Sequence, residues 1–241
     1  MRFKFFAAFL LIFPLMACTA KIISSAQLSY QGHPDIKING KTAVLAMMAA
    51  GSSSFENKSG SKIVEAPYSP PRILEGSELC LPSETSMEGF CNIANDILLA
   101  KLKEGKSGID VIPPKQVQGM VNQSEFMGEY LQFLNAYKYL GAHNDFLKKL
   151  GASLNCRYLL VPQLVVISNV NDNSLSVIWN FGKRSTDYSV IILAHVWDLS
   201  TGELIWTGRG TSFANVSLYD KSPSFDELAT GAADELLKLM P

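Results

Sequence analysis

The sequence predicts a single α/β domain, three-layer-like, with a mixed sheet, and three observations carry that prediction. A β-type segment, a helical segment and a second β-type segment follow one another over residues 41–113, which is the pattern of a βαβ unit. Apolar runs on both sides of a turn at 199–202 predict a hairpin, and with a third run they predict an antiparallel C-terminal meander. An amphipathic segment from residue 224 predicts a C-terminal helix packed on the sheet.

The N-terminal residues 1–17 have the pattern of a signal peptide. Arg2 and Lys4 precede an apolar run of about a dozen residues, which suits a signal peptide and is too short to span a bilayer. The run ends at Leu15-Met16-Ala17-Cys18, which resembles the processing site of bacterial lipoproteins, where the cysteine is acylated and becomes the new N-terminus. An ordinary secretory signal with a chance cysteine is the alternative.

A lipidated Cys18 implies a membrane-anchored protein. Acyl chains such as palmitate contribute about 0.8 kcal/mol for each buried methylene, so two or three of them anchor a protein stably. Thr19 rather than aspartate follows the cysteine, and resemblance to outward-sorted lipoproteins implies the periplasmic face of the outer membrane. Residues 18–39 are polar and mixed, and we expect them to form a tether to the folded domain at 40–241.

Charge argues against a nucleic-acid partner. Removal of the signal peptide lowers Lys+Arg from 21 to 19 against 22 Asp+Glu, so the mature chain carries a formal charge of −3. The remaining positive residues are scattered, whereas phosphate binding needs them clustered. We expect the lipid to be the only membrane attachment, because no second apolar run is long enough to span a bilayer.

The first half of the domain begins with a buried strand over 41–48. A Gly/Ser/Pro-rich loop of about thirty residues follows, over 49–82, and it is either a binding loop or a plain insertion. Thr85 and Glu88 form a capping-box pattern at the start of a helix that ends at Gly105. A short strand over 108–113 and two or three short helices over 114–150 complete this half.

The second half is richer in β-type residues. A long strand over 158–168 contains Pro162, which predicts a sheet edge or a bulge there. An insertion over 169–187 follows, and then the hairpin formed by 188–198 and 203–212. Ser224 and Glu227 form a second capping-box pattern at the start of the last helix.

The remaining cysteines suggest structural roles. Cys80 and Cys91 are near in sequence, and in the oxidising periplasm they either form a disulfide or stay free. Cys156 is expected to be a small buried apolar residue in a strand. No C-x-x-C pair occurs, so we expect no metal or redox site.

No motif predicts catalysis or a cofactor. Gly105-Lys106-Ser107 ends a helix instead of opening one, so it does not fit a phosphate-binding loop. The histidines are spread over different elements, and His195 lies inside a predicted strand. Asp198 and Glu203 flank a turn, where acids are usually solvated or cap the backbone. We therefore expect that the protein is not an enzyme.

The insertion at 169–187 is the candidate contact surface for a partner protein. Ile178, Trp179 and Phe181 stand next to Arg184, and aromatic residues with arginine are enriched at protein interfaces. The alternative is that the two aromatic rings fold back onto the sheet.

Two stretches resemble a superfamily of periplasmic lipoproteins. They are Leu150-Gly-Ala-Ser-Leu-Asn-Cys-Arg-Tyr-Leu-Leu-Val-Pro-Gln-Leu164 and Asp198-Leu-Ser-Thr-Gly-Glu-Leu-Ile-Trp206. Members of the superfamily include the secretion lipoprotein CsgG, the penicillin-binding-protein activator lipoproteins and the TolB N-terminal domain. The resemblance covers about residues 41–241 and implies an α/β domain that acts through protein contacts. Pore-forming members use long amphipathic hairpins, and residues 169–187 are too short and irregular for one.

These observations lead to one expected function and two alternatives. We expect a lipid-anchored periplasmic interaction module that recruits or activates a protein of cell-envelope assembly. The first alternative is a subunit of an oligomeric outer-membrane secretion channel, which would make the chain a homo-oligomer. The second is an envelope enzyme, which would need a cluster of polar catalytic groups that the sequence does not display.

Overall fold

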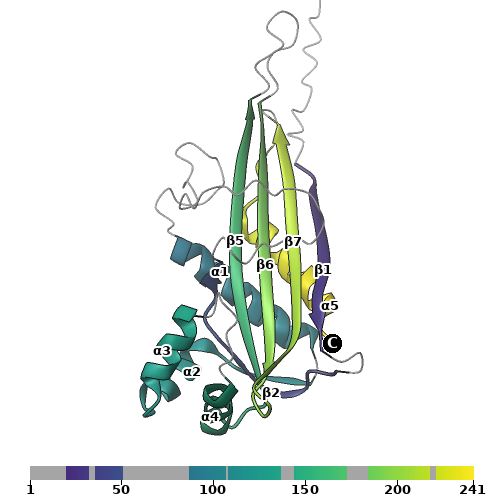
Figure 1. The fold of residues 1–241 in the computed structure, drawn as a ribbon. Coiled ribbons are helices and arrows are strands. Elements are labelled where there is room, and N and C mark those ends of the chain that lie inside the picture. The colour runs from purple at the N-terminus through teal and green to yellow at the C-terminus, as the bar shows by residue number, and fades with distance from the viewer. Residues whose placement is uncertain are drawn as a thin grey trace, which may run out of the picture.

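The computed structural model describes residues 20–32, 36–50, 87–106, 108–136, 144–172, 184–217 and 221–241. These residues form a mixed α/β domain around a seven-stranded sheet (Figure 1), as the sequence predicts. The elements are β1 (Ile22–Gln31), β2 (Gly40–Val44), β3 (Met48–Ala49), α1 (Met87–Gly105), β4 (Ile109–Ile112), α2 (Pro114–Asn122), α3 (Met127–Ala136), α4 (Asn144–Leu154), β5 (Tyr158–Asp172), β6 (Arg184–Asp198), β7 (Glu203–Ser217) and α5 (Phe225–Leu239). The strand order is β1-β7-β6-β5-β2-β4, with β3 also beside β5.

Strands β5, β6 and β7 form the predicted antiparallel meander. Each is 15 residues long, and β5 pairs with β6 along its whole length. The turn between β6 and β7 closes through the backbone N–H of Gly202, which donates to the carbonyl of Asp198 at 2.7 Å. Gly202 has a φ of 77°, a conformation that glycine adopts without steric cost. The strands extend into the predicted insertion at 169–187, which shortens the connection between them to residues 173–183.

The predicted tether contains a strand instead. Residues Ile22–Gln31 form β1, which pairs antiparallel with β7 at one edge of the sheet. The physical reason is tight packing, because Ser24 and Ala26, in the middle of the β1 face that α5 covers, have small side chains. Ser24 Oγ lies 2.6 Å from Ser212 Oγ of β7, beneath the helix. Ten residues of the predicted tether over 18–39 thus belong to the sheet of the folded domain.

The parallel part of the sheet confirms the predicted βαβ unit. Strands β2 and β4 pair in parallel, and α1 connects them along the chain. Both β2 and β3 pair in parallel with β5. Pro162 lies between Leu160, which pairs with β2, and Gln163, which pairs with β3. Strand β5 is thus internal and keeps a regular register with β6, which corrects the predicted edge or bulge.

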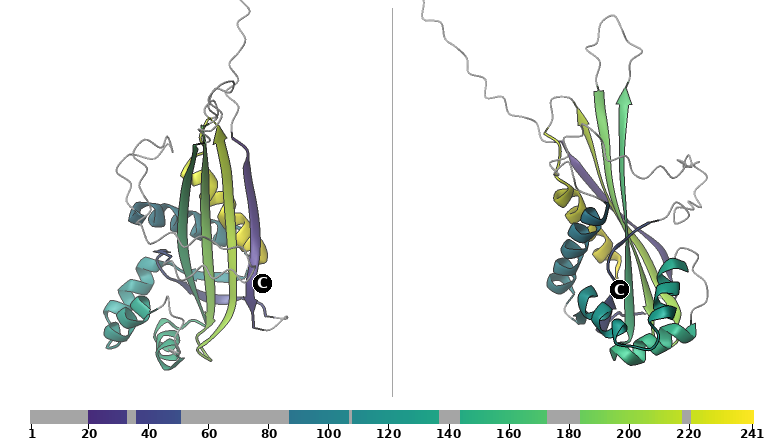
Figure 2. Two further views of the ribbon diagram at one scale, coloured as in Figure 1. Left: turned by 45° about the horizontal axis from the view of Figure 1, so that its top comes forward. Right: turned by 90° about the vertical axis from the view of Figure 1, so that its left-hand side faces the viewer.

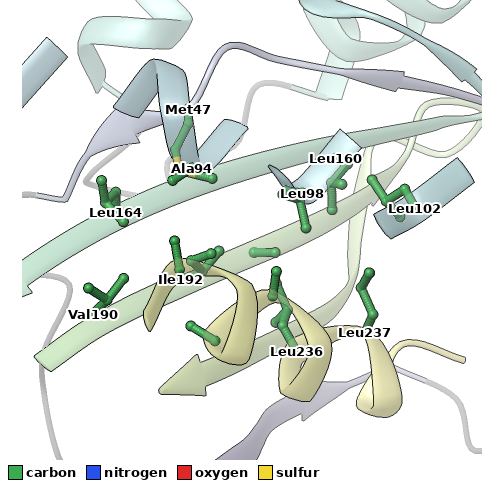
Figure 3. Close-up of a cluster of buried hydrophobic side chains, with 14 of the residues drawn as sticks. Met47, Ala94, Leu98, Leu102, Leu160, Leu164, Val190, Ile192, Leu236 and Leu237 are labelled. Atoms are coloured by element: carbon green, nitrogen blue, oxygen red, sulfur yellow. The ribbon is translucent and has the colours of Figure 1, made fainter. Parts of the chain in front are cut away.

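The sheet is covered on both faces, which gives the three layers (Figure 2). Helices α1 and α5 pack on one face, and their apolar side chains form the larger core with β5, β6 and β7. Figure 3 shows side chains of this core that converge from α1, β5, β6 and α5, namely Leu98, Leu164, Ile192 and Leu236. Helices α2, α3 and α4 cover the foot of the other face and enclose a second core. Tyr130 and Phe133 of α3 belong to that second core.

Helix α5 begins at the predicted capping box. The Ser224 hydroxyl accepts from the backbone N–H of Glu227 at 3.2 Å, and the Glu227 carboxylate accepts from the backbone N–H of Ser224 at 2.8 Å. The helix lies so close to β7 that a Cβ added to Gly210 would sit 1.9 Å from the carbonyl oxygen of Ala232. Among the described elements, no helix combines the length and the hydropathy that crossing a bilayer requires.

Candidate functional site

A shallow groove of about 630 Å³ lies at the foot of the sheet, where α4 meets the start of β5 and the β6–β7 turn. Three basic residues line it, namely Lys41, Lys148 and Arg157. The other lining residues are Asn39, Gly40, Gly151, Ala152, Asn155, Cys156, Leu199 and Ser200. The groove therefore combines three basic side chains with a largely apolar lining, and Arg157 is paired with Asp198.

One acid beside the groove is fully engaged. Asp198 is 5% exposed and accepts from the Ser200 hydroxyl at 2.5 Å and its backbone N–H at 2.8 Å. Arg157 donates to the same carboxylate from two nitrogens, each at 3.1 Å, and its guanidinium lies over the ring of Tyr158. Burial alone would raise the pKa of Asp198, but the bonds from Ser200 and Arg157 outweigh it and lower that pKa. Asp198 thus caps the turn, as the sequence predicts.

The groove also contains a thiol of low reactivity. Cys156 is half-buried and precedes β5, which corrects its predicted place inside a strand. Burial raises the pKa of this thiol, although a bond to the backbone of Ala43 and the charge of Lys41 act in the opposite direction. A thiol with a raised pKa is mostly protonated at neutral pH, and nucleophilic attack needs the thiolate.

His195 and the two tryptophans of the hairpin are structural. Burial lowers the pKa of His195 to about 4, so its imidazole is neutral at pH 7. Trp206 is fully buried against α5, and Trp197 is 6% exposed in the second core. Both tryptophans therefore serve the packing of the sheet. Gly105 ends α1, as predicted.

Several predicted site residues lie outside the described part of the chain. They are Cys18, Cys80, Ile178, Trp179, Phe181 and residues 51–82 of the predicted loop at 49–82, whose first residue, Ala49, belongs to β3. Cys91 is buried in α1, and burial, with a smaller contribution from Glu88, raises the pKa of its thiol to about 11. The Cys80–Cys91 bridge stays a prediction. Arg184 opens β6 at the end of its pairing with β5. Within the described residues, no three His, Cys, Asp or Glu side chains gather as a metal site.

The strand register places the start of β1 and the start of β6 at the same end of the sheet. Ile22 pairs with Ala214, and Ala214 pairs with Tyr188 on its other side. Strand β6 starts four residues beyond Tyr188, at Arg184, which is about 13 Å further along the sheet. Cys18 is four residues before Ile22 and so lies at most about 14 Å from it.

The free edge of β1 is a surface that the sequence did not predict. In the described residues, four large apolar side chains are exposed, and three of them belong to this strand. They are Ile23, Leu28 and Tyr30, with exposed fractions of 55%, 43% and 47%; the fourth is Leu131 on α3. Strand β1 contains neither the lysine nor the proline that would mark it as a sheet edge in the sequence, so this patch became visible only in the fold.

Comparisons with known proteins find likeness only among solved structures. No protein-family model matches the chain, and no curated protein matches it. A PelC dodecamer from Paraburkholderia phytofirmans is 14% identical with a TM-score of 0.35, over 89% of this chain and 95% of that one. The hypothetical protein CT253 from Chlamydia trachomatis is 12% identical with a TM-score of 0.40, over 84% and 94% of the two chains. Likeness at this level carries no argument about function or assembly, and the resemblance to CsgG and its relatives stays a prediction.

Proposed function

We propose that the protein is a lipid-anchored periplasmic interaction module of the outer membrane, which recruits or activates a partner in cell-envelope assembly. Cys18 carries the lipid, and the chain between β5 and β6, with Ile178, Trp179, Phe181 and Arg184, contributes contacts to the partner. The module needs no cofactor and uses no catalytic residue.

The observation that supports this function is that β1 and β6 start at the same end of the sheet. The starts of β1 and β6 and the end of β5 lie at one end of the molecule (Figure 1). The groove and the β6–β7 turn lie at the other end, about 50 Å away for a strand of 15 residues. A lipid at Cys18 therefore holds the hairpin end next to the membrane and presents the long sheet to the periplasm.

Acyl labelling tests the anchor. Wild-type protein and Cys18→Ala are expressed with labelled palmitate, and membrane and soluble fractions are separated. We expect label and membrane attachment in the wild type only. Cys156→Ser is the matched control, because Cys156 is half-buried in the folded domain and its loss leaves the lipid in place. Incorporation of label by Cys18→Ala would reject the anchor.

Crosslinked capture from intact envelopes tests the partner contact. We expect a discrete set of captured proteins for the wild type and a loss of that set for Trp179→Ala. Trp197→Phe is a matched aromatic control, since Trp197 is buried in the second core and distant from the hairpin end. Capture that does not depend on Trp179 would remove the contact assignment. A ring of many copies in mild detergent would instead favour the secretion-channel subunit.

A further inference from the structure

Strand β1 has the properties of an unprotected sheet edge. Its ten residues, IISSAQLSYQ, contain no charge and no proline. No described strand pairs with its outer side, so alternate residues direct their N–H and C=O groups away from the sheet. Edge strands are ordinarily protected by lysine, proline, brevity or a covering element, because a free edge templates pairing with another chain.

The exposed apolar side chains lie on both faces of this edge. Ile23 pairs with Phe213, on the face that α5 leaves open, and Leu28 pairs with Gly208, on the face that α5 covers. A register shift between Leu28 and Tyr30 returns Tyr30 to the open face, opposite Thr207. A strand added to β1 would therefore gain main-chain hydrogen bonds together with apolar contacts on either face.

We propose that the free edge of β1 binds an extended, uncharged segment of a different envelope protein by strand addition. This inference rests on the proposed function, since it names the surface through which the module meets its partner. The segment is expected to carry apolar residues opposite Ile23, Leu28 and Tyr30, because cross-strand apolar pairs stabilise a ladder. It is expected to lack charges opposite β1, since the edge offers no charge to pair with them.

A second copy of this chain fits the edge less well. The register shift after Leu28 limits a regular two-fold pairing of β1 with itself to residues 22–28, centred on Ser25. Ile23 would then face the polar Gln27 of the second copy, and Tyr30 would lie outside the ladder. Self-pairing would thus leave two of the three exposed apolar side chains without an apolar partner, whereas a foreign segment can match all three.

Photocrosslinking in living cells tests the proposal. A photoreactive benzoylphenylalanine is introduced into the full-length lipidated protein at Ser25 or at Gln27, two exposed positions on the same face of β1. We expect both positions to form an adduct with one envelope protein. Mass spectrometry should map the two crosslinks to residues two positions apart in a single segment, because that spacing is the signature of a paired strand.

Lysine substitutions provide the matched comparison. Ile23→Lys places a charge on the edge and is expected to lower the adduct yield about tenfold, since edge lysines block strand pairing. Leu131→Lys is the control, because Leu131 is 51% exposed on α3 and away from the edge, and it should leave the yield unchanged. Unchanged melting temperatures of both variants establish that folding is intact.

Four results would overturn strand addition. They are the absence of adducts at Ser25 and Gln27, an adduct of twice the chain mass, crosslinks that map to unrelated segments, and an Ile23→Lys variant with full yield. If these occur while capture still depends on Trp179, the interaction module stands and only the β1 edge is rejected. Loss of palmitate labelling at Cys18 tests the anchor separately.

Discussion

Asp198 joins three separate parts of the chain through one buried carboxylate. It ends β6, caps the β6–β7 turn through Ser200, and accepts from Arg157 at the start of β5. The guanidinium is 61% exposed, so solvent screens its share of the attraction. The bonds from the Ser200 hydroxyl and backbone N–H therefore account for most of the stabilisation that the carboxylate contributes.

Replacing this carboxylate should reduce stability in a pH-dependent way. We expect Asp198→Asn to lower the free energy of unfolding at pH 7 by about 1–3 kcal/mol, the usual worth of a hydrogen bond to a charged group. The native pKa of Asp198 is depressed, so its contribution is complete above the ordinary value near 4 and is lost as the pH falls further. Urea unfolding at pH 7 and pH 2.5 measures the difference. Glu203→Gln, in the same turn but exposed, should be neutral at both.

The lowered pKa of His195 predicts a second loss of stability, at a higher pH than the loss that Asp198 causes. Its native pKa of about 4 is below the ordinary 6.5, so the unfolded chain binds a proton before the native state does. The protein should lose stability as the pH falls from 6.5 to 4, by up to about 3 kcal/mol for a shift of this size. We expect the midpoint of urea unfolding to depend less on pH over that range in His195→Gln than in the wild type. An unchanged slope in the variant would assign the loss to other groups.

At the scale of elements, the contact between α5 and β7 depends on residues without side chains. Gly210 of β7 leaves no room for a Cβ beneath Ala232, and a Cβ on Gly231 of α5 would meet the hydroxyls of Ser212 and Ser24. Helix and sheet can approach this closely only where both surfaces are small. The same closeness explains why the small residues Ser24 and Ala26 stand on the β1 face beneath α5.

A pair of glycine substitutions tests this contact. Gly210→Ala should destabilise the protein by about 1–3 kcal/mol or more, because the added methyl group forces the helix away from the sheet. Gly119→Ala is the counterpart, since Gly119 lies in α2 with open space around its Cα. Alanine at that helical position should stabilise by about 0.5–1 kcal/mol. Thermal unfolding of the two variants should therefore shift in opposite directions.

The sequence predicts elements whose signal is carried by apolar periodicity or by turn and cap residues. The hairpin around Gly202, the βαβ unit and the Ser224–Glu227 cap were predictable for that reason. Strand β1 was not, because its buried face consists of residues such as Ser24 and Ala26, which carry no hydrophobic signal. Residues 169–172 were missed for a similar reason, since they are polar yet continue the ladder of β5.

The candidate site was less predictable than the fold. The sequence suggested contact residues by composition, and the structure places only the strand end at Arg184 for that segment. The basic groove combines Lys41, Lys148 and Arg157 from distant parts of the chain, and no local pattern indicates that they meet. The exposed edge at Ile23 depends on strand order, which follows from pairing over nearly the whole chain.

At the scale of the whole molecule, the anchor predicts an orientation that can be measured. A genetically encoded fluorescent residue is placed at Thr186 or at Thr201 of the lipidated protein, which is reconstituted into vesicles with acceptor-labelled headgroups. The two positions lie near opposite ends of β6, about 40 Å apart. We expect strong energy transfer from position 186 and little from 201. Equal transfer from both would show that the sheet lies flat on the membrane.

The pairing of β1 with β7 has a consequence for biogenesis. Ser24 and Ser212 are in contact although 188 positions separate them in sequence. Strand β1 is synthesised first and cannot pair until β7, the last strand in chain order, has been synthesised. Pairing between such distant segments is slow, because the entropy of closing the chain precedes the gain from contacts. Until β7 has been synthesised, β1 therefore has both edges unpaired.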